Sequence, residues 1–115
     1  MKIDFFRDYC LKKNGATEST PFGEDTLCFQ VGGKIFAIID IERFESVNLK
    51  CDPERALLLR EQYPGIQAGY HMNKKHWNTV SFDGSVSDPL ILELVDHSYD
   101  LVFAGLPKKI KEQFS

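Results

Sequence analysis

A chain of 115 residues is long enough for one domain and too short for two. Hydrophobic and charged fractions of 43% and 27% are those of a globular protein and exclude a disordered chain. A formal net charge of −3 differs from the basic balance of generic nucleic-acid coating proteins, so any basic surface has to be local.

Three cysteines, Cys10, Cys28 and Cys51, are too widely spaced for a disulfide framework or a structural zinc site. We expect three buried thiols in a reducing compartment. The first residues lack the apolar run of a signal peptide, and the longest apolar run, residues 35–39, is far shorter than a membrane span. We therefore expect a cytoplasmic protein without a membrane partner.

Hydrophobic periodicity predicts a helix over residues 2–14. The core face of this helix is expected to consist of Phe5, Phe6, Tyr9 and Cys10. Residues 16–24 are predicted to form a loop. Three strands are predicted next, at residues 26–31, 34–41 and 46–51. The first two are joined by Gly32-Gly33, a hairpin turn in which both residues can adopt positive φ.

Two later helices carry start signals, an Asp or Ser that can cap the first turn, followed by Pro. They are predicted over residues 52–63 and 87–105, with a strand at residues 75–82 between them and a short basic tail after the second. The order of helix, three strands, helix, strand and helix predicts an α+β fold. In this fold, an antiparallel meander sheet carries its helices on one face.

Side chains that could bind a ligand are most concentrated in residues 69–80. This segment holds two of the three histidines, the only tryptophan and two adjacent lysines. Such side chains can bond phosphate oxygens and base edges, and aromatic rings can stack on bases. If Val80 and Phe82 face the core, Trp77 faces the other side of the sheet. Its expected companions there are Lys75, Thr79, Ser81, Cys28, Gln30, Lys34, Phe36, Asn48 and Lys50. This face is either a platform for nucleic acid or a solvated surface on which Trp77 packs against Phe36.

Catalytic and metal-binding signatures are absent from the sequence. GxSxG, P-loop, GxGxxG and HExxH motifs do not occur, so we expect neither a cofactor nor catalysis. His71 and His76 are five residues apart, which suits neither one helical face nor strand alternation, so we expect no metal there. An enzyme that uses these histidines with Cys51 is a third alternative.

Motifs spread over nearly the whole chain resemble the MmcQ/YjbR family. They are TPFG at 20–23, FQV at 29–31, GKIFA at 33–37, LKCDPE at 49–54, YPGI at 63–66, GYHMNKKHWNTV at 69–80, DGS at 83–85 and LPKK at 106–109. The resemblance implies one domain over residues 1–115, a CyaY/frataxin-like two-layer sandwich, and the family's description as proposed DNA-binding proteins with a double-wing motif. The likeness to frataxins also implies iron binding by a ridge of acidic side chains. In this sequence the ridge would consist of Asp4, Asp8, Glu18, Glu24 and Asp25. Basic residues are interleaved among them and reduce the negative charge of the ridge.

The leading hypothesis is therefore a monomeric DNA-binding module in which lysines contact phosphate, polar side chains add contacts and Trp77 stacks. The candidate residues are Lys50, His71, Asn73, Lys74, Lys75, His76, Trp77, Lys108 and Lys109. The alternative is a regulatory domain that binds a protein or a small ligand and has no nucleic-acid role.

Overall fold

The computed structural model describes residues 1–69 and 73–114. Its elements, in chain order, are α1 (Ile3–Leu11), β1 (Ala16–Ser19), β2 (Thr26–Val31), β3 (Lys34–Asp40), β4 (Ser46–Lys50), α2 (Pro53–Gln62), β5 (Ile66–Ala68), β6 (Trp77–Ser81), α3 (Asp88–Ala104) and α4 (Lys108–Glu112). Within the described residues, no helix combines the length and the apolar character needed to cross a bilayer.

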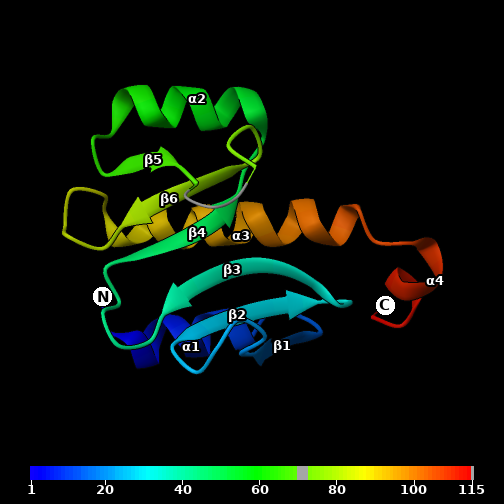
Figure 1. Ribbon diagram of the computed structural model, residues 1–115. Coiled ribbons are helices and arrows are strands. Elements are labelled where there is room, and N and C mark those ends of the chain that lie inside the picture. The colour runs from blue at the N-terminus through cyan, green and yellow to red at the C-terminus, as the bar shows by residue number, and fades with distance from the viewer. Residues whose placement is uncertain (70–72, 115) are drawn as a thin grey trace.

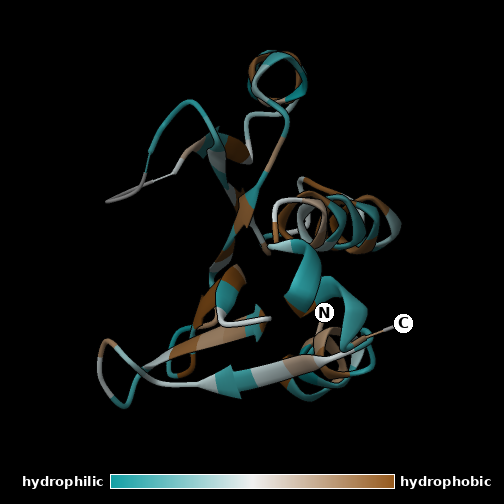
Figure 2. Cartoon of the chain, turned by 90° about the vertical axis from the view of Figure 1, so that its right-hand side faces the viewer, coloured by the Kyte–Doolittle hydropathy of each residue, from teal (hydrophilic) through white to brown (hydrophobic). Residues whose placement is uncertain are grey.

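The six strands form one antiparallel sheet in the order β1-β2-β3-β4-β6-β5. The first four strands follow one another as a meander, and α2 then carries the chain to β5 at the far edge. Helices α1 and α3 lie behind the sheet in Figure 1. The sheet is strongly curved when seen from the side in Figure 2, with α3 against its inner face. The predicted α+β class, meander and one-sided helices are confirmed.

The core lies between the sheet and the helices α1 and α3. Phe6 of α1 is fully buried and makes edge contacts with Phe29, Phe44 and Phe82, at centroid distances of 6.0, 5.9 and 5.5 Å. The prediction that Phe5 also faces the core is wrong, because its side chain is 55% exposed. Helix α1 has only nine residues, and its buried positions are Phe6 and Cys10.

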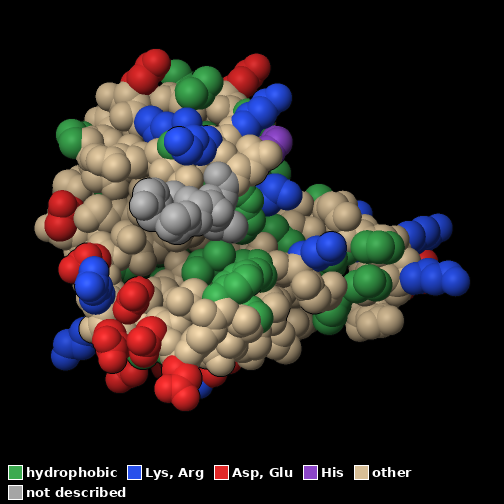
Figure 3. Space-filling view, in the orientation of Figure 1, with side chains coloured by type: hydrophobic (Ala, Val, Ile, Leu, Met, Phe, Trp, Pro, Cys, Tyr) green, Lys and Arg blue, Asp and Glu red, His purple; other side chains and the backbone are tan. Residues whose placement is uncertain are grey.

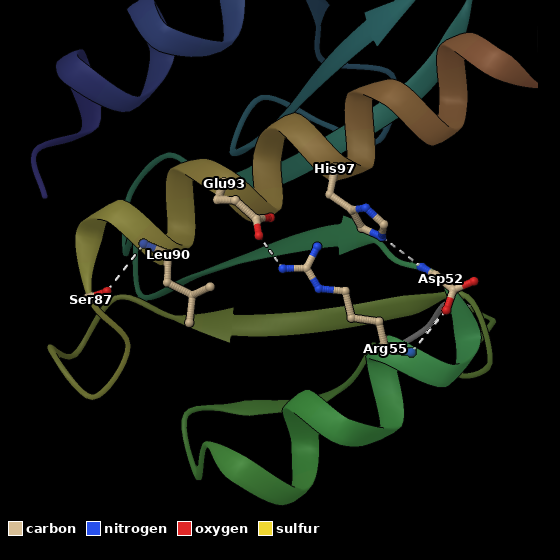
Figure 4. Close-up of polar contacts among 6 residues, drawn as sticks. All are labelled: Asp52, Arg55, Ser87, Leu90, Glu93 and His97. Atoms are coloured by element: carbon tan, nitrogen blue, oxygen red, sulfur yellow. Dashed lines mark hydrogen bonds and ion pairs between the residues drawn. The ribbon is translucent and has the colours of Figure 1, made fainter.

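Both predicted helix starts are confirmed by their caps (Figure 4). Asp52 Oδ2 accepts a hydrogen bond from the backbone N–H of Arg55 at 3.1 Å, and Ser87 Oγ accepts one from that of Leu90 at 3.3 Å. Each cap satisfies a backbone donor that has no partner within the helix.

Two strands were not predicted. β1 lies in the expected loop at residues 16–24, and β5 follows α2. Both are short, with four and three residues, so neither shows a hydrophobic alternation of useful length. β1 is held by its pairing with β2, which includes a 2.9 Å bond from Ser19 Oγ to Gln30 Oε1.

The predicted outer position of Phe36 is wrong, because β3 contains a bulge. Phe29 pairs with Ala37, and the next residue, Gln30, pairs with Ile35. Phe36 is therefore an extra residue in β3. Its ring is fully buried and lies 5.4 Å from that of Tyr99 on α3. Cys28, also expected on the outer face, alternates with the core residues Leu27 and Phe29 but is itself fully buried. Trp77 consequently has no Phe36 beside it on an outer platform.

Candidate functional site

Strands β3 and β4 pair at three positions and then diverge toward the C-terminal end of α3 (Figure 1). Beyond the last pair, Ser98 of α3 takes the place of a direct bond between the strands. The backbone N–H of Lys50 donates to Ser98 Oγ at 2.9 Å, and this hydroxyl donates to the carbonyl oxygen of Phe36 at 2.6 Å. Because Ser98 is fully buried, its hydroxyl allows the strands to separate while both backbone groups keep a partner.

This divergence opens a groove of about 470 Å³ at the end of the sheet. The groove is lined by Gly33, Lys34, Ile35, Lys50, Trp77, Val102 and Gly105, and we call it the Lys34–Trp77 groove. Lys34 comes from β3, whereas Lys50 and Trp77 are direct cross-strand partners on β4 and β6. Two cationic side chains and one aromatic ring thus surround a partly apolar lining.

The backbone of Trp77 is held from both sides. The Gly69 N–H donates to its carbonyl oxygen at 2.8 Å, and its own N–H donates to the carbonyl oxygen of Asn73 at 3.0 Å. A Cβ added to Gly69 would lie 2.9 Å from Trp77 Cβ, so glycine is needed for this close approach. The indole is half-buried and takes part in the groove lining.

Residues 73–76 form a turn that is fixed by α2. The guanidinium of Arg60 bonds to the carbonyl oxygen of Lys74 and, through Nε, to Asn78 Oδ1 at 2.7 Å. Asn73 Oδ1 accepts from the Lys75 N–H at 2.9 Å. The Lys74 and Lys75 side chains are exposed while their backbone is anchored. Sequence reasoning missed Arg60, and no sequence signal separates it from other helix-surface arginines.

The fold brings together most of the predicted site residues. Those at this end of the sheet are Lys50, Asn73, Lys74, Lys75, His76 and Trp77. The carbonyl oxygen of His76 accepts from the Cys51 N–H at 2.8 Å. Lys108 and Lys109 are exposed on α4, which packs against the Gly32 turn. His71 lies outside the described residues.

Charged side chains of both signs lie on the face shown in Figure 3. Asp and Glu side chains gather at the lower left, with some Lys or Arg side chains beside them, and other acidic side chains lie at the top; further Lys and Arg side chains lie in the upper part and at the right-hand end. Asp40, Arg43 and Glu45 line a second hollow. The negative net charge therefore coexists with a local group of lysines around the Lys34–Trp77 groove.

Comparison with known proteins identifies the family. A family model described as YjbR matches residues 11–101. The chain belongs to the YjbR family. It is 37% identical to YjbR of Escherichia coli K12 over 110 residues, which cover 95% of this chain and 93% of that protein. It is also 42% identical to YbdF of Escherichia coli O157:H7 over 90 residues, covering 77% and 74%. Both relatives are called uncharacterized proteins.

Solved structures agree with this family assignment. The crystal structure of DR2400 from Deinococcus radiodurans superimposes with a TM-score of 0.91 at 38% identity, covering 98% of this chain and 87% of that one. A Pseudomonas syringae protein superimposes with a TM-score of 0.74 at 30% identity, covering 89% and 99%. The implied membership of the MmcQ/YjbR family is confirmed.

The cysteines of this YjbR-family chain are buried, as expected. Burial raises the pKa of Cys51 to about 11 and that of Cys10 to about 12. Both thiols are therefore protonated at neutral pH, whereas a nucleophilic cysteine requires the thiolate. The Cys51 thiol does not have the electrostatic environment of an activated nucleophile.

The acidic ridge implied by the frataxin resemblance does not fit iron. Arg7 donates from Nε to Glu18 Oε2 at 2.7 Å and pairs through its second nitrogen with Oε1, so both carboxylate oxygens are engaged. This hydrogen bonding lowers the pKa of Glu18. Within residues 1–69 and 73–114, no three His, Cys, Asp or Glu side chains gather as a metal site.

Proposed function

We propose that this YjbR-family protein is a non-catalytic nucleic-acid-binding module whose ligand is DNA. The observation that carries the proposal is the direct cross-strand pairing of Lys50 with Trp77, with Lys34 on the opposite wall of the groove. Lys74 and Lys75 extend the same surface through the adjoining turn. We further propose that the protein acts as a monomer in the cytoplasm.

Two kinds of contact support this proposal. Lysine ammonium groups attract phosphate oxygens and position a nucleic acid without reading its sequence, and an indole can stack on a base. The bonds of Arg60 and Asn73 hold the backbone of the lysine-bearing turn in the free protein. Less ordering of that turn is therefore required on binding, which favours affinity.

The acidic residues Asp40 and Glu45 also have a role in this proposal. Asp40 and Glu45, which outnumber Arg43 in the second hollow, would repel phosphate and so orient an approaching nucleic acid toward the lysines. Lys108 and Lys109 on α4 carry the positive charge beyond the groove. A non-catalytic role is supported by the raised pKa of Cys51, the nucleophile considered from the sequence.

The test is fluorescence anisotropy of labelled mixed-sequence DNA, single- and double-stranded, at two salt concentrations. Three or four phosphate contacts predict a log–log salt slope of roughly −2 to −4. The double variant Lys74→Ala/Lys75→Ala is expected to bind more weakly, whereas Lys2→Ala/Lys12→Ala, which removes two exposed lysines from the α1 region, serves as the matched control.

Absence of binding at low salt would overturn the proposal and favour a regulatory domain for a protein or small ligand. Equal loss in the two double variants would show that total charge, and not this surface, controls the affinity.

A further inference from the structure

We propose that the Lys34–Trp77 groove receives one unpaired nucleotide, so that the protein prefers single-stranded to duplex DNA; this inference rests on the proposed function above. The base would stack on Trp77, and the phosphates on either side would contact Lys34 and Lys50. Three structural observations carry the assignment.

First, Trp77 is one of the residues that line the groove. Trp77 shares the lining with Ile35 of β3 and with Val102 of α3. A half-buried indole in such a groove is accessible to a base that has left its stack, whereas the bases of an intact duplex have both faces covered by their neighbours.

Second, the two lysines lie on opposite walls of the groove, with Lys50 beside Trp77 on one wall and Lys34 on the other. Lys34 begins β3 and Lys50 ends β4, on the two strands that Ser98 holds apart. A nucleotide of a single strand has a phosphate on each side of its base. The groove therefore offers an apolar and aromatic surface for the base and one cation for each flanking phosphate.

Third, the three longer helices, α1, α2 and α3, do not present a basic face that suits the major groove of a duplex, and the lysine-bearing α4 has only five residues. Duplex readers commonly place such a helix in that groove. Arg7 of α1 and Arg55 of α2 are instead paired with Glu18 and Glu93, and Arg60 of α2 bonds the turn at residues 73–76.

Two further elements that could approach a duplex are also unsuited to it. The polar stripe of α3 is not basic, because Glu93 is paired with Arg55, Asp96 is paired with Lys13, and the exposed Asp100 would repel phosphate. The tip of the β2–β3 hairpin is Gly32-Gly33, which has no side chains to reach base edges. These features favour a single strand over a duplex.

Trp77 is the only tryptophan of the chain, so intrinsic fluorescence reports directly on the groove. The experiment titrates the wild-type protein with an eight-nucleotide oligo(dT) and with a hairpin duplex of eight base pairs. We expect oligo(dT) to quench Trp77 and to bind at least about tenfold more tightly than the duplex, the equivalent of about 1.4 kcal/mol, within the range for stacking of one base.

Variants separate the contributions to single-strand binding. Trp77→Ala is expected to weaken oligo(dT) binding about 5- to 150-fold, and Trp77→Phe to retain most of it. Lys34→Ala and Lys50→Ala should each reduce the magnitude of the salt slope by about 0.7 for a single strand. Lys74→Ala/Lys75→Ala should weaken both DNA forms alike. The wild-type quenching and Lys34→Ala test the groove independently of the folding of Trp77→Ala.

Two failures are distinguishable. If neither DNA form binds at low salt, the proposed function fails and this inference fails with it. If the duplex binds as tightly as oligo(dT), without quenching, and Lys74→Ala/Lys75→Ala still weakens it, DNA binding stands and the single-nucleotide groove is overturned.

Discussion

Arg60 on α2 and Asn78 on β6 are joined by a 2.7 Å hydrogen bond from Nε to Oδ1. Asn78 is 2% exposed, and its amide nitrogen also donates to the carbonyl oxygen of Ala56 at 3.4 Å. The same guanidinium reaches the carbonyl oxygen of Lys74. One arginine thus couples helix α2, a buried side chain of the sheet and the lysine-bearing turn.

Arg60→Ala is expected to lower the free energy of unfolding by about 1–3 kcal/mol, because it leaves the Asn78 side-chain oxygen without this donor. Arg60→Lys keeps the positive charge but lacks the planar guanidinium with its several N–H donors. It should therefore restore only part of the lost free energy of unfolding. Urea unfolding measures both changes, and amide hydrogen exchange should rise at residues 73–77. Unchanged exchange there in Arg60→Ala would show that α2 does not hold the turn.

Ser98→Ala removes the hydroxyl that links the N–H of Lys50 to the carbonyl oxygen of Phe36. Both backbone groups lose their bond to it in a buried setting, so we expect a loss of about 1–3 kcal/mol in urea unfolding. Thr20→Ala, at an exposed loop position, is the control and should change stability by less than about 0.5 kcal/mol. Similar stability of the two variants would contradict the bridging role of Ser98.

Gly32 and Gly33 form a matched pair for separating backbone strain from steric overlap. Their φ angles are +57° and +80°. A Cβ added at Gly32 would lie 2.7 Å from Leu106 Cδ1, whereas one added at Gly33 has no atom within 4 Å. We expect Gly33→Ala to cost roughly 1–2 kcal/mol from the left-handed backbone alone, and Gly32→Ala to cost more. Thermal and urea unfolding compare them, and equal losses would refute the contact with α4.

His97 predicts a pH dependence of stability. Its Nε2 accepts from the Asp52 N–H at 3.1 Å, as Figure 4 shows, which requires the neutral ring. Burial, followed by repulsion from Arg55, lowers the pKa of His97 from its ordinary value of 6.5, while Glu93, Asp52 and Asp100 act in the opposite direction. The unfolded chain therefore binds this proton first as the pH falls.

Stability should consequently fall as the pH drops through about 6.5 toward the lower pKa of the folded state, and level off above about 7.5. Urea unfolding between about pH 5 and pH 8 measures the slope. His97→Gln, whose side-chain oxygen can still accept the hydrogen bond but does not titrate, should have a flatter profile over this interval. An unchanged slope in His97→Gln would assign the pH dependence to other groups.

The sequence alone determined the features that depend on neighbouring residues. The caps at Asp52 and Ser87 and the hairpin at Gly32-Gly33 lie where their local signals placed them, because a cap or a tight turn is completed within a few positions. The long apolar stripe of α3 was likewise readable from its period. These signals were sufficient for the α+β class and for the family.

Only the tertiary structure decided the bulge that buries Phe36, the short edge strands and the groove itself. Ser98 lies 62 residues from Phe36 and 48 from Lys50 along the chain, and Arg60 lies 18 from Asn78. No local pattern records such bonds. The groove exists because the buried hydroxyl of Ser98 bonds to the N–H of Lys50 and the carbonyl oxygen of Phe36, which would otherwise bond to each other. The position of this hydroxyl depends on how α3 packs on the sheet.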